Sequence, residues 1–329
     1  MAILVCGGAG YIGSHTVRQL VAAGEDVIVA DNFSTGHRRA IDPAAKIYRC
    51  DIRDKDALKK IFAAEKIEAV IHFAAFIEAG ESVRKPLKYF DNNVCGTEIL
   101  LEAMVEGGVD KIIFSSSAAV YGEPERIPID EDDQTLPVNP YGSSKLMMEM
   151  MMRSVAAAHS VKFVSLRYFN ASGAIEDGSI GEDHHPETHL IPLILQVPLG
   201  QRDNITVFGT DYPTPDGTCI RDYVHVLDLA AAHLNALNYL RGGGSSDFFN
   251  LGNGRGFSVR EIIDAAEKIV GKKISTVFGE RRPGDPARLI ASGAKARRIL
   301  NWTPRFDDVE RIIATAWRWH STHPFGYGD

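Results

Sequence analysis

The sequence predicts an α/β protein with a doubly wound parallel sheet and a smaller mixed α/β domain. A glycine-rich turn joins an apolar strand at 2–6 to an amphipathic helix at about 14–23. Continuous apolar strands then alternate with helical patterns through the first half of the chain, as in a parallel sheet covered on both faces. This alternation is lost in the second half, so we expect a second domain there.

The elements of the first half follow one another in strand–helix order. After the first strand, strands are expected at 26–30, 46–50, 69–73, 111–115 and 161–166. Helices are expected at 54–64, at 81–106 with a break near Pro86, and at 140–158. A doubly wound sheet of this Rossmann type binds its ligand at the carboxyl ends of the strands. The residues that follow each strand are therefore the candidates for a binding site.

The second half is expected to be less regular. Loops are expected at 174–188 and 211–218, helices at 190–199, 226–240, 258–270 and 310–319, and a strand at 247–251 that rejoins the main sheet. The predicted domains are therefore a nucleotide-binding domain at 1–170, to which about 224–252 returns, and a mainly substrate-binding domain at 171–329.

The composition is that of an ordinary globular protein, with 45% hydrophobic and 24% charged residues among 329. A net charge of −7 argues against nucleic-acid or membrane-surface partners. No apolar run approaches the roughly 20 residues that a membrane span needs, and no basic leader precedes the first strand. Four cysteines are scattered without a C-x-x-C pair, so we expect reduced thiols and a cytoplasmic location.

Residues 7–13 set Gly7, Gly10 and Gly13 in a G-x-x-G-x-x-G spacing between the first strand and its helix. Glycine lets the backbone approach a phosphate closely. The helix that follows offers unpaired N–H groups and the positive end of its dipole to an anion. A tight turn without a ligand is the alternative, but the position between strand and helix favours a nucleotide site.

Acidic residues follow the next two strands. Asp31 comes eighteen residues after Gly13, where a carboxylate can accept hydrogen bonds from an adenosine ribose and would repel a 2′-phosphate. This favours NAD over NADP, although Arg38 and Arg39 keep NADP open. Asp51 could reach an adenine amino group or cap the next helix.

Tyr141 and Lys145 lie four residues apart at the start of the helix predicted at 140–158, so they share one face. A nearby ammonium favours the phenolate and is expected to lower the tyrosine pKa from about 10, as a nicotinamide cation would. The pair could then act as a general base near neutral pH. Ser117, just after the strand at 111–115, could hydrogen-bond the same substrate oxygen.

These features together resemble the extended short-chain dehydrogenase/reductase family. The glycine spacing, the Y-x-x-x-K of Tyr141 and Lys145, and the serine-rich strand end carry the resemblance. Longer blocks are similar to its UDP-glucose 4-epimerase members, from one end of the chain to the other: 7–15 (GGAGYIGSH), 91–96 (DNNVCG), 114–122 (FSSSAAVYG), 140–145 (PYGSSK), 166–170 (LRYFN), 221–229 (RDYVHVLDL) and 281–285 (RRPGD).

The resemblance implies an NAD-dependent isomerase of galactose metabolism that interconverts UDP-glucose and UDP-galactose. Tyr141 would take the proton of the sugar C4 hydroxyl while the C4 hydride passes to NAD⁺. The 4-keto sugar would then rotate and receive the hydride on its other face. Lys145 would orient the nicotinamide ribose and lower the tyrosine pKa, and Ser117 would assist proton transfer.

The same resemblance implies the binding residues. Cofactor contacts would come from Gly7, Gly10, Tyr11, Ile12, Gly13, Asp31, Asn32, Asp51, Ile52, Phe73, Ala74, Ala75, Asn92, Tyr141, Lys145 and Phe169. Substrate contacts would come from Ser117, Tyr141, Asn170, Arg221, Arg282 and Asp285. Arginine suits a diphosphate, although surface ion pairs would also explain these arginines.

Two positions depart from the family pattern. Ile77 stands where some members carry a lysine that contacts the cofactor. Leu289 stands at a pocket position where a tyrosine excludes N-acetylated sugars and a small residue admits them. Epimerisation of a UDP-N-acetylhexosamine or a UDP-pentose is therefore an alternative.

Two rivals on the same fold are a nucleotide-sugar dehydratase or decarboxylase and a non-catalytic NAD sensor. The dehydratases carry an Asp–Glu pair where this chain has Ala118 and Ala119. A sensor would not need Tyr141, Lys145 and Ser117 together.

Two residue clusters remain outside the proposed chemistry. Methionines crowd the helix that carries Lys145, which predicts a homodimer packed through it: Met147, Met148, Met150, Met151 and Met152. Acidic and histidine residues gather in the loop before residue 190, where their spacing matches no structural zinc pattern: Glu182, Asp183, His184, His185 and His189. We therefore expect no metal, and expect this loop to border the substrate pocket.

Overall fold

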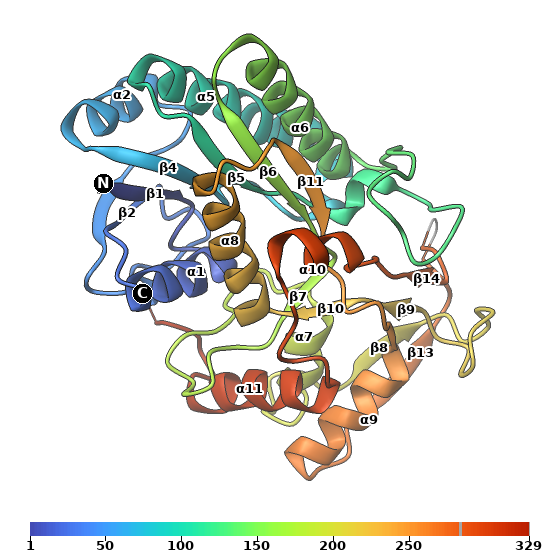
Figure 1. The fold of residues 1–329 in the computed structure, drawn as a ribbon. Coiled ribbons are helices and arrows are strands. Elements are labelled where there is room, and N and C mark those ends of the chain that lie inside the picture. The colour runs from blue at the N-terminus through green and yellow to red at the C-terminus, as the bar shows by residue number, and fades with distance from the viewer. Residues whose placement is uncertain (283–284, 329) are drawn as a thin grey trace.

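The computed structural model describes residues 1–282 and 285–328 and has the predicted doubly wound sheet (Figure 1). Seven parallel strands pair in the order β11-β6-β5-β4-β1-β2-β3. They are β1 (Ala2–Cys6), β2 (Val27–Asp31), β3 (Lys46–Arg49), β4 (Ile67–His72), β5 (Lys111–Ser115), β6 (Lys162–Arg167) and β11 (Asp247–Asn250). The order reverses between β1 and β4, so the carboxyl ends of these strands open the ligand crevice.

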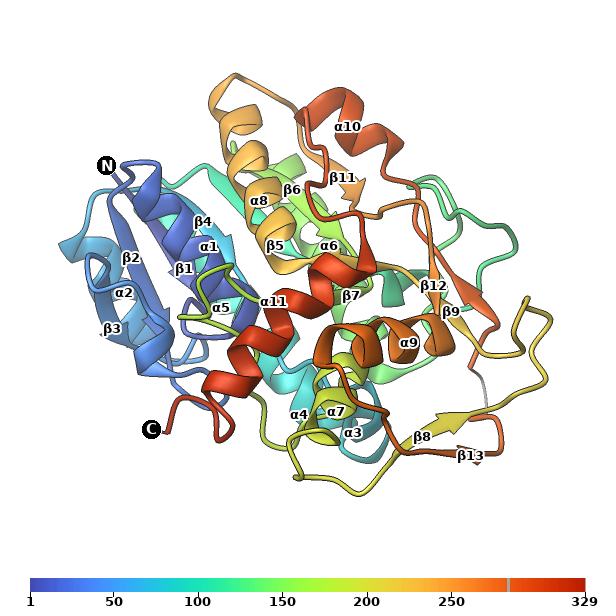
Figure 2. The ribbon, with the colours of Figure 1, turned by 90° about the horizontal axis from the view of Figure 1, so that it is seen from below.

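Helices cover both faces of the sheet (Figures 1 and 2). Along β1, Ile3 and Val5 pack toward one face, while Leu4 and Cys6 pack toward the other. The first face is covered by α1 (Tyr11–Ala22) and α8 (Val226–Arg241). The second is covered by α2 (Lys55–Ala64), α5 (Gly96–Gly107) and α6 (Pro140–Ala158). This two-sided burial explains why the strands are continuous apolar runs.

The helix predicted at 81–106 is broken near Pro86, as expected. The chain forms α3 (Ala79–Arg84), α4 (Pro86–Tyr89), a π-helical turn (Phe90–Cys95) and then α5. Within the π-helical turn, Asn93 accepts a hydrogen bond from the Phe76 N–H (2.8 Å) and donates to Ser144 Oγ (2.9 Å). The turn therefore ties the loop after β4 to helix α6.

The second half contains helices near the predicted positions and short strands that the sequence did not predict. The helices are α7 (Leu190–Gln196), α9 (Val259–Val270), α10 (Ala294–Leu300) and α11 (Val309–Thr322), and Figure 2 shows α7, α9 and α11 together. Of these, α10 was not predicted. The short pairings join β7 (Asn170–Ser172) to β10 (Tyr223–His225) and β8 (Ile205–Phe208) to β13 (Thr276–Gly279), while β9 (Ile220–Arg221) pairs with both β12 (Phe257–Ser258) and β14 (Arg288–Leu289).

Two further expectations concern thiols and membranes. Cys6, Cys50, Cys95 and Cys219 are all free thiols. Within residues 1–282 and 285–328, every helix is too short or too polar to cross a bilayer.

A buried ion pair fixes α6 against the sheet. Glu149 on α6 and Arg167 at the end of β6 are 1% and 4% exposed, and their Oε2 and Nη2 atoms are 2.7 Å apart. Glu149 Oε1 also accepts hydrogen bonds from Ser116 and Ser165, each at 2.7 Å. Arg167 Nη1 donates to the Tyr121 hydroxyl at 2.8 Å. Charges this well paired can be tolerated away from water.

We predict that Glu149→Ala destabilises the protein strongly, because Arg167 would stay buried without its counter-charge. Breaking such a pair costs about 3–5 kcal/mol, which urea denaturation would show as a lower midpoint. The control is Glu310→Ala, which removes the exposed pair with Lys268 and should change the unfolding free energy by less than about 1 kcal/mol. Equal losses in the two variants would contradict the role of Glu149.

Candidate active site

The glycine turn closes tightly on itself and on the end of β4. A Cβ added to Gly7, whose φ is +81°, would lie 2.5 Å from the Ala74 nitrogen. One added to Gly13 would lie 2.2 Å from the Gly7 carbonyl oxygen. A Cβ at Gly10 would meet only that same oxygen, at 3.5 Å. The first and last glycines are thus needed for the turn, while the middle one leaves open space for a ligand.

The start of α1 fits the diphosphate of a dinucleotide. Gly10 is the N-cap and, within the described chain, offers no side-chain hydrogen bond to the first turn. That turn also carries no acidic residue. The N–H groups of Tyr11, Ile12 and Gly13 could therefore bind an anion without competition from a carboxylate in their own turn.

Asp31 lies at the end of β2 against this turn. Its Oδ2 accepts a hydrogen bond from the Ala9 N–H at 2.9 Å, and its Oδ1 accepts one from the Phe33 N–H at 2.8 Å. Burial raises the pKa of Asp31, although these two hydrogen bonds oppose the shift. The lone pairs that remain could accept ribose hydroxyls. Arg39, one of the two arginines that kept NADP open, donates instead to the Tyr327 carbonyl at 2.6 Å.

Asp51 does not cap the following helix, because Asp54 fills that position by accepting from the Ala57 N–H. Asp51 Oδ2 instead accepts from Asn32 Nδ2 at 2.9 Å and from Arg53 Nη2 at 2.7 Å. Hydrogen bonds from Arg53 hold the pKa of Asp51 well below its usual range. The Asp51 carboxylate is therefore ionised, and its hydrogen bond from Asn32 connects it to the loop after β2.

The three candidate catalytic side chains come from adjacent elements. Pro140 opens α6, and Asn139 caps it by accepting from the Gly142 N–H at 2.9 Å. Lys145 is only 2% exposed, and its Nζ donates to the Ser115 carbonyl at 2.8 Å. The same Nζ lies 6.0 Å from the centre of the Tyr141 ring. Helix α6 and the end of β5 therefore present phenol, ammonium and the nearby Ser117 hydroxyl to one crevice.

Burial dominates the ionisation of this group. It raises the pKa of Tyr141, and the hydrogen bond with Ser117 offsets only part of the shift. Burial also lowers the pKa of Lys145 to about 7, against the opposing charge of Glu149. The expectation that Lys145 lowers the Tyr141 pKa is therefore wrong for the protein chain alone. The lysine is directed to the Ser115 carbonyl, and the low-polarity surroundings disfavour both charges.

The candidate substrate residues lie on the short strands of the second half. Arg221 on β9 forms an ion pair with Asp285, so these two predicted residues do meet. Asn170 on β7 donates to the Asp222 carbonyl at 3.0 Å. The Arg282 carbonyl accepts a hydrogen bond from the Asp285 N–H at 3.2 Å, and the Arg282 guanidinium lies 4.2 Å from the centre of the Phe208 ring. Arginine and carboxylate groups that face the crevice are suited to a nucleoside diphosphate.

The two departures from the family pattern have different surroundings. Leu289 and Phe169 both pack against a buried cluster that includes Ala118 and Tyr121, which follow Ser117 in the sequence. Ile77 is 40% exposed in the loop after β4. Of the two, Leu289 is therefore the residue that could shape the substrate pocket.

The loop before α7 holds a residue that the sequence analysis missed. Glu187 joins Glu182, His184 and His189, whose ligand-type atoms all lie within 4.8 Å of one another. Burial disfavours a charged His184, but pairing with Glu182 and Glu187 outweighs it and raises the pKa of His184 to about 9. His189 also lines a small cleft that includes Asn170 and Tyr223, so this loop does border the candidate substrate residues.

Comparison with known proteins shows similarity along the whole chain. Residues 3–252 match the sequence model described as the NAD dependent epimerase/dehydratase family. A UDP-glucose 4-epimerase from Lacticaseibacillus casei is 58% identical, with 100% of this chain and 99% of that protein aligned.

Solved structures give the same result. A crystal structure of a UDP-glucose 4-epimerase, 54% identical, superposes with a TM-score of 0.99 over 100% of both chains. The UDP-glucose 4-epimerase of Bifidobacterium longum in complex with NAD⁺ and UDP is 40% identical, with a TM-score of 0.93 over 99% of this chain and 100% of that one.

We predict that Gly13→Ala reduces bound dinucleotide at least about tenfold. The new Cβ would meet the backbone of Gly7, which cannot swing aside as a side chain can. Dinucleotide released by acid from the purified protein measures the loss. Gly80→Ala is the matched control, because its Cβ would meet no described atom within 4 Å. A Gly13→Ala protein with a full complement of dinucleotide would show that the glycine turn does not bind the dinucleotide.

Proposed function

The chain belongs to the NAD dependent epimerase/dehydratase family, and we propose that it is a UDP-glucose 4-epimerase, which interconverts UDP-glucose and UDP-galactose. One observation carries this proposal. The chain is similar over its full length to enzymes of that activity, and it combines Tyr141, Lys145 and Ser117 with the glycine turn. The reaction inverts the sugar C4 without net oxidation.

The cofactor is NAD, which supplies a hydride acceptor and donor when bound. The glycine turn and the start of α1 would hold its diphosphate. Asp31 and Asn32 would hold the adenosine ribose, and Asp51 the adenine. Lys145, with one N–H on the Ser115 carbonyl, retains donors for the nicotinamide ribose.

Tyr141 would act as the base that removes the C4 hydroxyl proton and later returns it. Burial alone would keep its phenol protonated, so the base depends on positive charge beside it. The nicotinamide cation and a protonated Lys145 are the two sources of that charge. Ser117 would hydrogen-bond the same oxygen and hold the sugar in place during proton transfer.

Substrate binding is proposed for Asn170, Arg221, Arg282 and Asp285. Arg221 already has a carboxylate partner in Asp285, so the arginine is held in place before a diphosphate arrives. Leu289, which packs against the same cluster as Phe169, would decide how large a C2 substituent fits. UDP-N-acetylhexosamines and UDP-pentoses are therefore the alternative substrates.

The rivals on the same fold fit less well. Ala118 and Ala119 begin the short 3-10 helix capped by Ser117, so no acid or base stands where a dehydratase needs one. A sensor that only binds NAD would not need a buried lysine one helical turn from a half-buried tyrosine.

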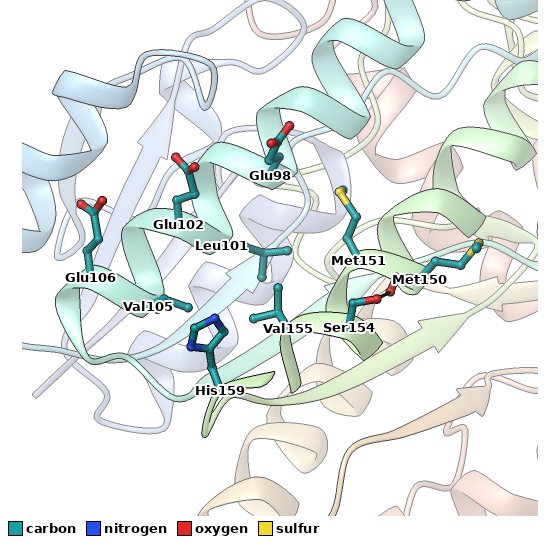
Figure 3. Close-up of a pocket in the computed structure, with 10 residues that line it drawn as sticks. All are labelled: Glu98, Leu101, Glu102, Val105, Glu106, Met150, Met151, Ser154, Val155 and His159. Carbon is teal, nitrogen blue, oxygen red and sulfur yellow. Dashed lines mark hydrogen bonds between the residues drawn. The ribbon is translucent and has the colours of Figure 1, made fainter. Parts of the chain in front are cut away.

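We also propose a homodimer packed through α5 and α6. A groove of about 560 Å³ runs between these helices, with apolar side chains along its floor (Figure 3). Met148 and Met152 are buried beneath it, whereas Met147 and Met150 are exposed, Met150 by 58%. The groove lies away from the candidate active site. Its lining is Glu98, Leu101, Glu102, Val105, Glu106, Met150, Met151, Ser154, Val155 and His159.

The domain division is proposed as residues 1–170 with 224–252, and the remainder of 171–329. It is supported by separate cores, since Leu229 on α8 packs with the main sheet while Ile262 and Ile312 pack with α7. A cytoplasmic location is proposed from the four free cysteines.

The purified protein should convert UDP-galactose to UDP-glucose without added cofactor. Tyr141→Phe should lower this turnover by about 10²–10⁴-fold, because no other described side chain can replace the base, while UDP binding by calorimetry should persist. UDP-N-acetylglucosamine assayed in parallel separates the substrate alternatives. Lack of conversion by wild-type protein that contains NAD would refute the epimerase proposal, and full activity of Tyr141→Phe would remove Tyr141 as the base.

Met150→Glu should disrupt the dimer, because it places a carboxylate in an apolar interface already flanked by Glu98 and Glu102. Sedimentation velocity at micromolar concentration should then show a monomer for the variant and a dimer for the wild type. Phe325→Glu, at a side chain 85% exposed near the C-terminus, is the control and should stay dimeric. A monomeric wild type would contradict the proposed interface.

A further inference from the structure

Four side chains outside the proposed chemistry converge in the loop between β7 and α7. Glu182 and His184 lie in its extended part, and Glu187 and His189 lie just before Leu190 opens α7. His184 Nδ1 is 3.3 Å from Glu182 Oε1 and 3.6 Å from Glu187 Oε2. His189 Nδ1 is 2.7 Å from Glu182 Oε1 and 3.3 Å from Glu187 Oε1. Two nitrogens and two carboxylates thus surround one point.

The approaches between these groups are close but are not all directed hydrogen bonds. Glu182 Oε1, His184 Nδ1 and His189 Nδ1 are fully buried, and within residues 1–282 and 285–328 each lacks a partner in hydrogen-bond geometry. Protonated imidazoles paired with carboxylates would aim their N–H groups at the oxygens. Here the ligand-type atoms of the four side chains gather within 4.8 Å of one another without that geometry, and such a gathering is typical of metal ligands.

The spacing fits a small tetrahedral ion. Bonds of about 2.0–2.2 Å hold tetrahedral ligand atoms roughly 3.3–3.6 Å apart. Three of the four imidazole–carboxylate separations, at 3.3, 3.3 and 3.6 Å, match this value, while His189 Nδ1 and Glu182 Oε1 lie closer, at 2.7 Å. Calcium and magnesium prefer all-oxygen sites, whereas two imidazoles with two carboxylates suit zinc.

The residues around the four side chains hold them in place and shield them from solvent. Glu187 Oε1 accepts hydrogen bonds from the backbone N–H groups of Thr188 (2.7 Å) and His189 (2.8 Å), which fix its carboxylate. The His184 ring packs edge-on against the ring of Tyr11, with centroids 6.2 Å apart. The side chains of Glu182, His184 and Glu187 are each at most 14% exposed. Ligand orientation by such neighbours is typical of metal sites.

The residues between the ligands face elsewhere. Asp183 Oδ2 accepts a hydrogen bond from the Tyr327 N–H at 2.9 Å, on the side of the C-terminal segment. His185 is 79% exposed, and its Nε2 lies 3.2 Å from Asp183 Oδ1. The extended backbone therefore sends alternate residues to opposite sides, so only Glu182 and His184 of this stretch join the cluster.

The sequence alone led us to expect no metal in this loop, but from the folded cluster we propose that Glu182, His184, Glu187 and His189 bind one zinc ion. With four protein ligands the site would be closed and structural. Neutral imidazoles, two carboxylates and Zn²⁺ sum to no net charge, which suits the buried position. The ion would hold the loop between Tyr11, at the glycine turn, and His189, which lines the cleft with Asn170. It would thereby link the cofactor side of the crevice to the substrate side.

The experiment is metal analysis of the full-length protein, purified without chelator from zinc-supplemented cells. We expect about one zinc per chain in the wild type, and at most about a tenth of that in His184→Ala/His189→Ala. His185→Ala is the matched control and should keep its zinc, because this exposed neighbour is not a ligand. Zinc removal should lower the melting temperature of the wild type, and zinc addition should restore it.

Cobalt substitution tests the site without any variant. Cobalt(II) bound to the metal-stripped wild type should give the intense visible absorption of tetrahedral coordination, and zinc should abolish it. Wild-type protein with no more zinc than the double variant, no cobalt spectrum and no melting shift would overturn the proposal. The cluster would then be two protonated histidines paired with two carboxylates. None of these readouts depends on epimerase activity.

Discussion

The buried pair of Glu149 and Arg167 fixes the helix on which the proposed chemistry depends. Helix α6 supplies Tyr141 and Lys145, and Glu149 stands one turn beyond the lysine. A buried carboxylate that must meet Arg167 and two serine hydroxyls allows the helix one rotation and one height against β5 and β6. Because a helix is stiff over two turns, fixing the carboxylate also fixes the phenol and the ammonium.

The low polarity that makes this anchor effective also controls proton transfer. Burial disfavours the Tyr141 phenolate and the Lys145 ammonium alike. A tyrosine in such surroundings is a poor base until positive charge is brought beside it. The proposed enzyme would therefore have its base active mainly when the oxidised cofactor is in place, which ties proton removal to hydride removal.

Much of this architecture could be predicted from residue patterns, because the main sheet and its helices produce long signals. Helix α6 coincides with the predicted range, since Pro140 and Asn139 mark its start chemically. Apart from β11, the strands of two to four residues in the second half were missed, because so few residues show no periodicity. Their partners are chosen by tertiary packing, as in the pairing of β12 with β9.

In the candidate site, too, features set by local spacing could be predicted, whereas features set by tertiary packing could not. Tyr141 and Lys145 share a helix face, so their proximity followed from spacing alone. The direction of the Tyr141 pKa did not, because burial depends on everything packed around the ring. Likewise, Glu187 could be assigned to a cluster only when folding brought it to Glu182, and the hydrogen bond from Arg39 to the Tyr327 carbonyl joins residues 288 positions apart.

Strand β11 closes the sheet with residues that come late in the chain. It pairs with β6, and its Asn250 accepts from the Tyr121 hydroxyl at 2.8 Å. During synthesis, β6 leaves the ribosome about eighty residues before β11, its edge partner. Until β11 follows, β6 is an unpaired, apolar edge of the sheet in the nascent nucleotide-binding half. Folding of the first half therefore cannot finish until much of the second has left the ribosome. The two halves are distinct in their cores but must be made, and protected from aggregation, as one unit.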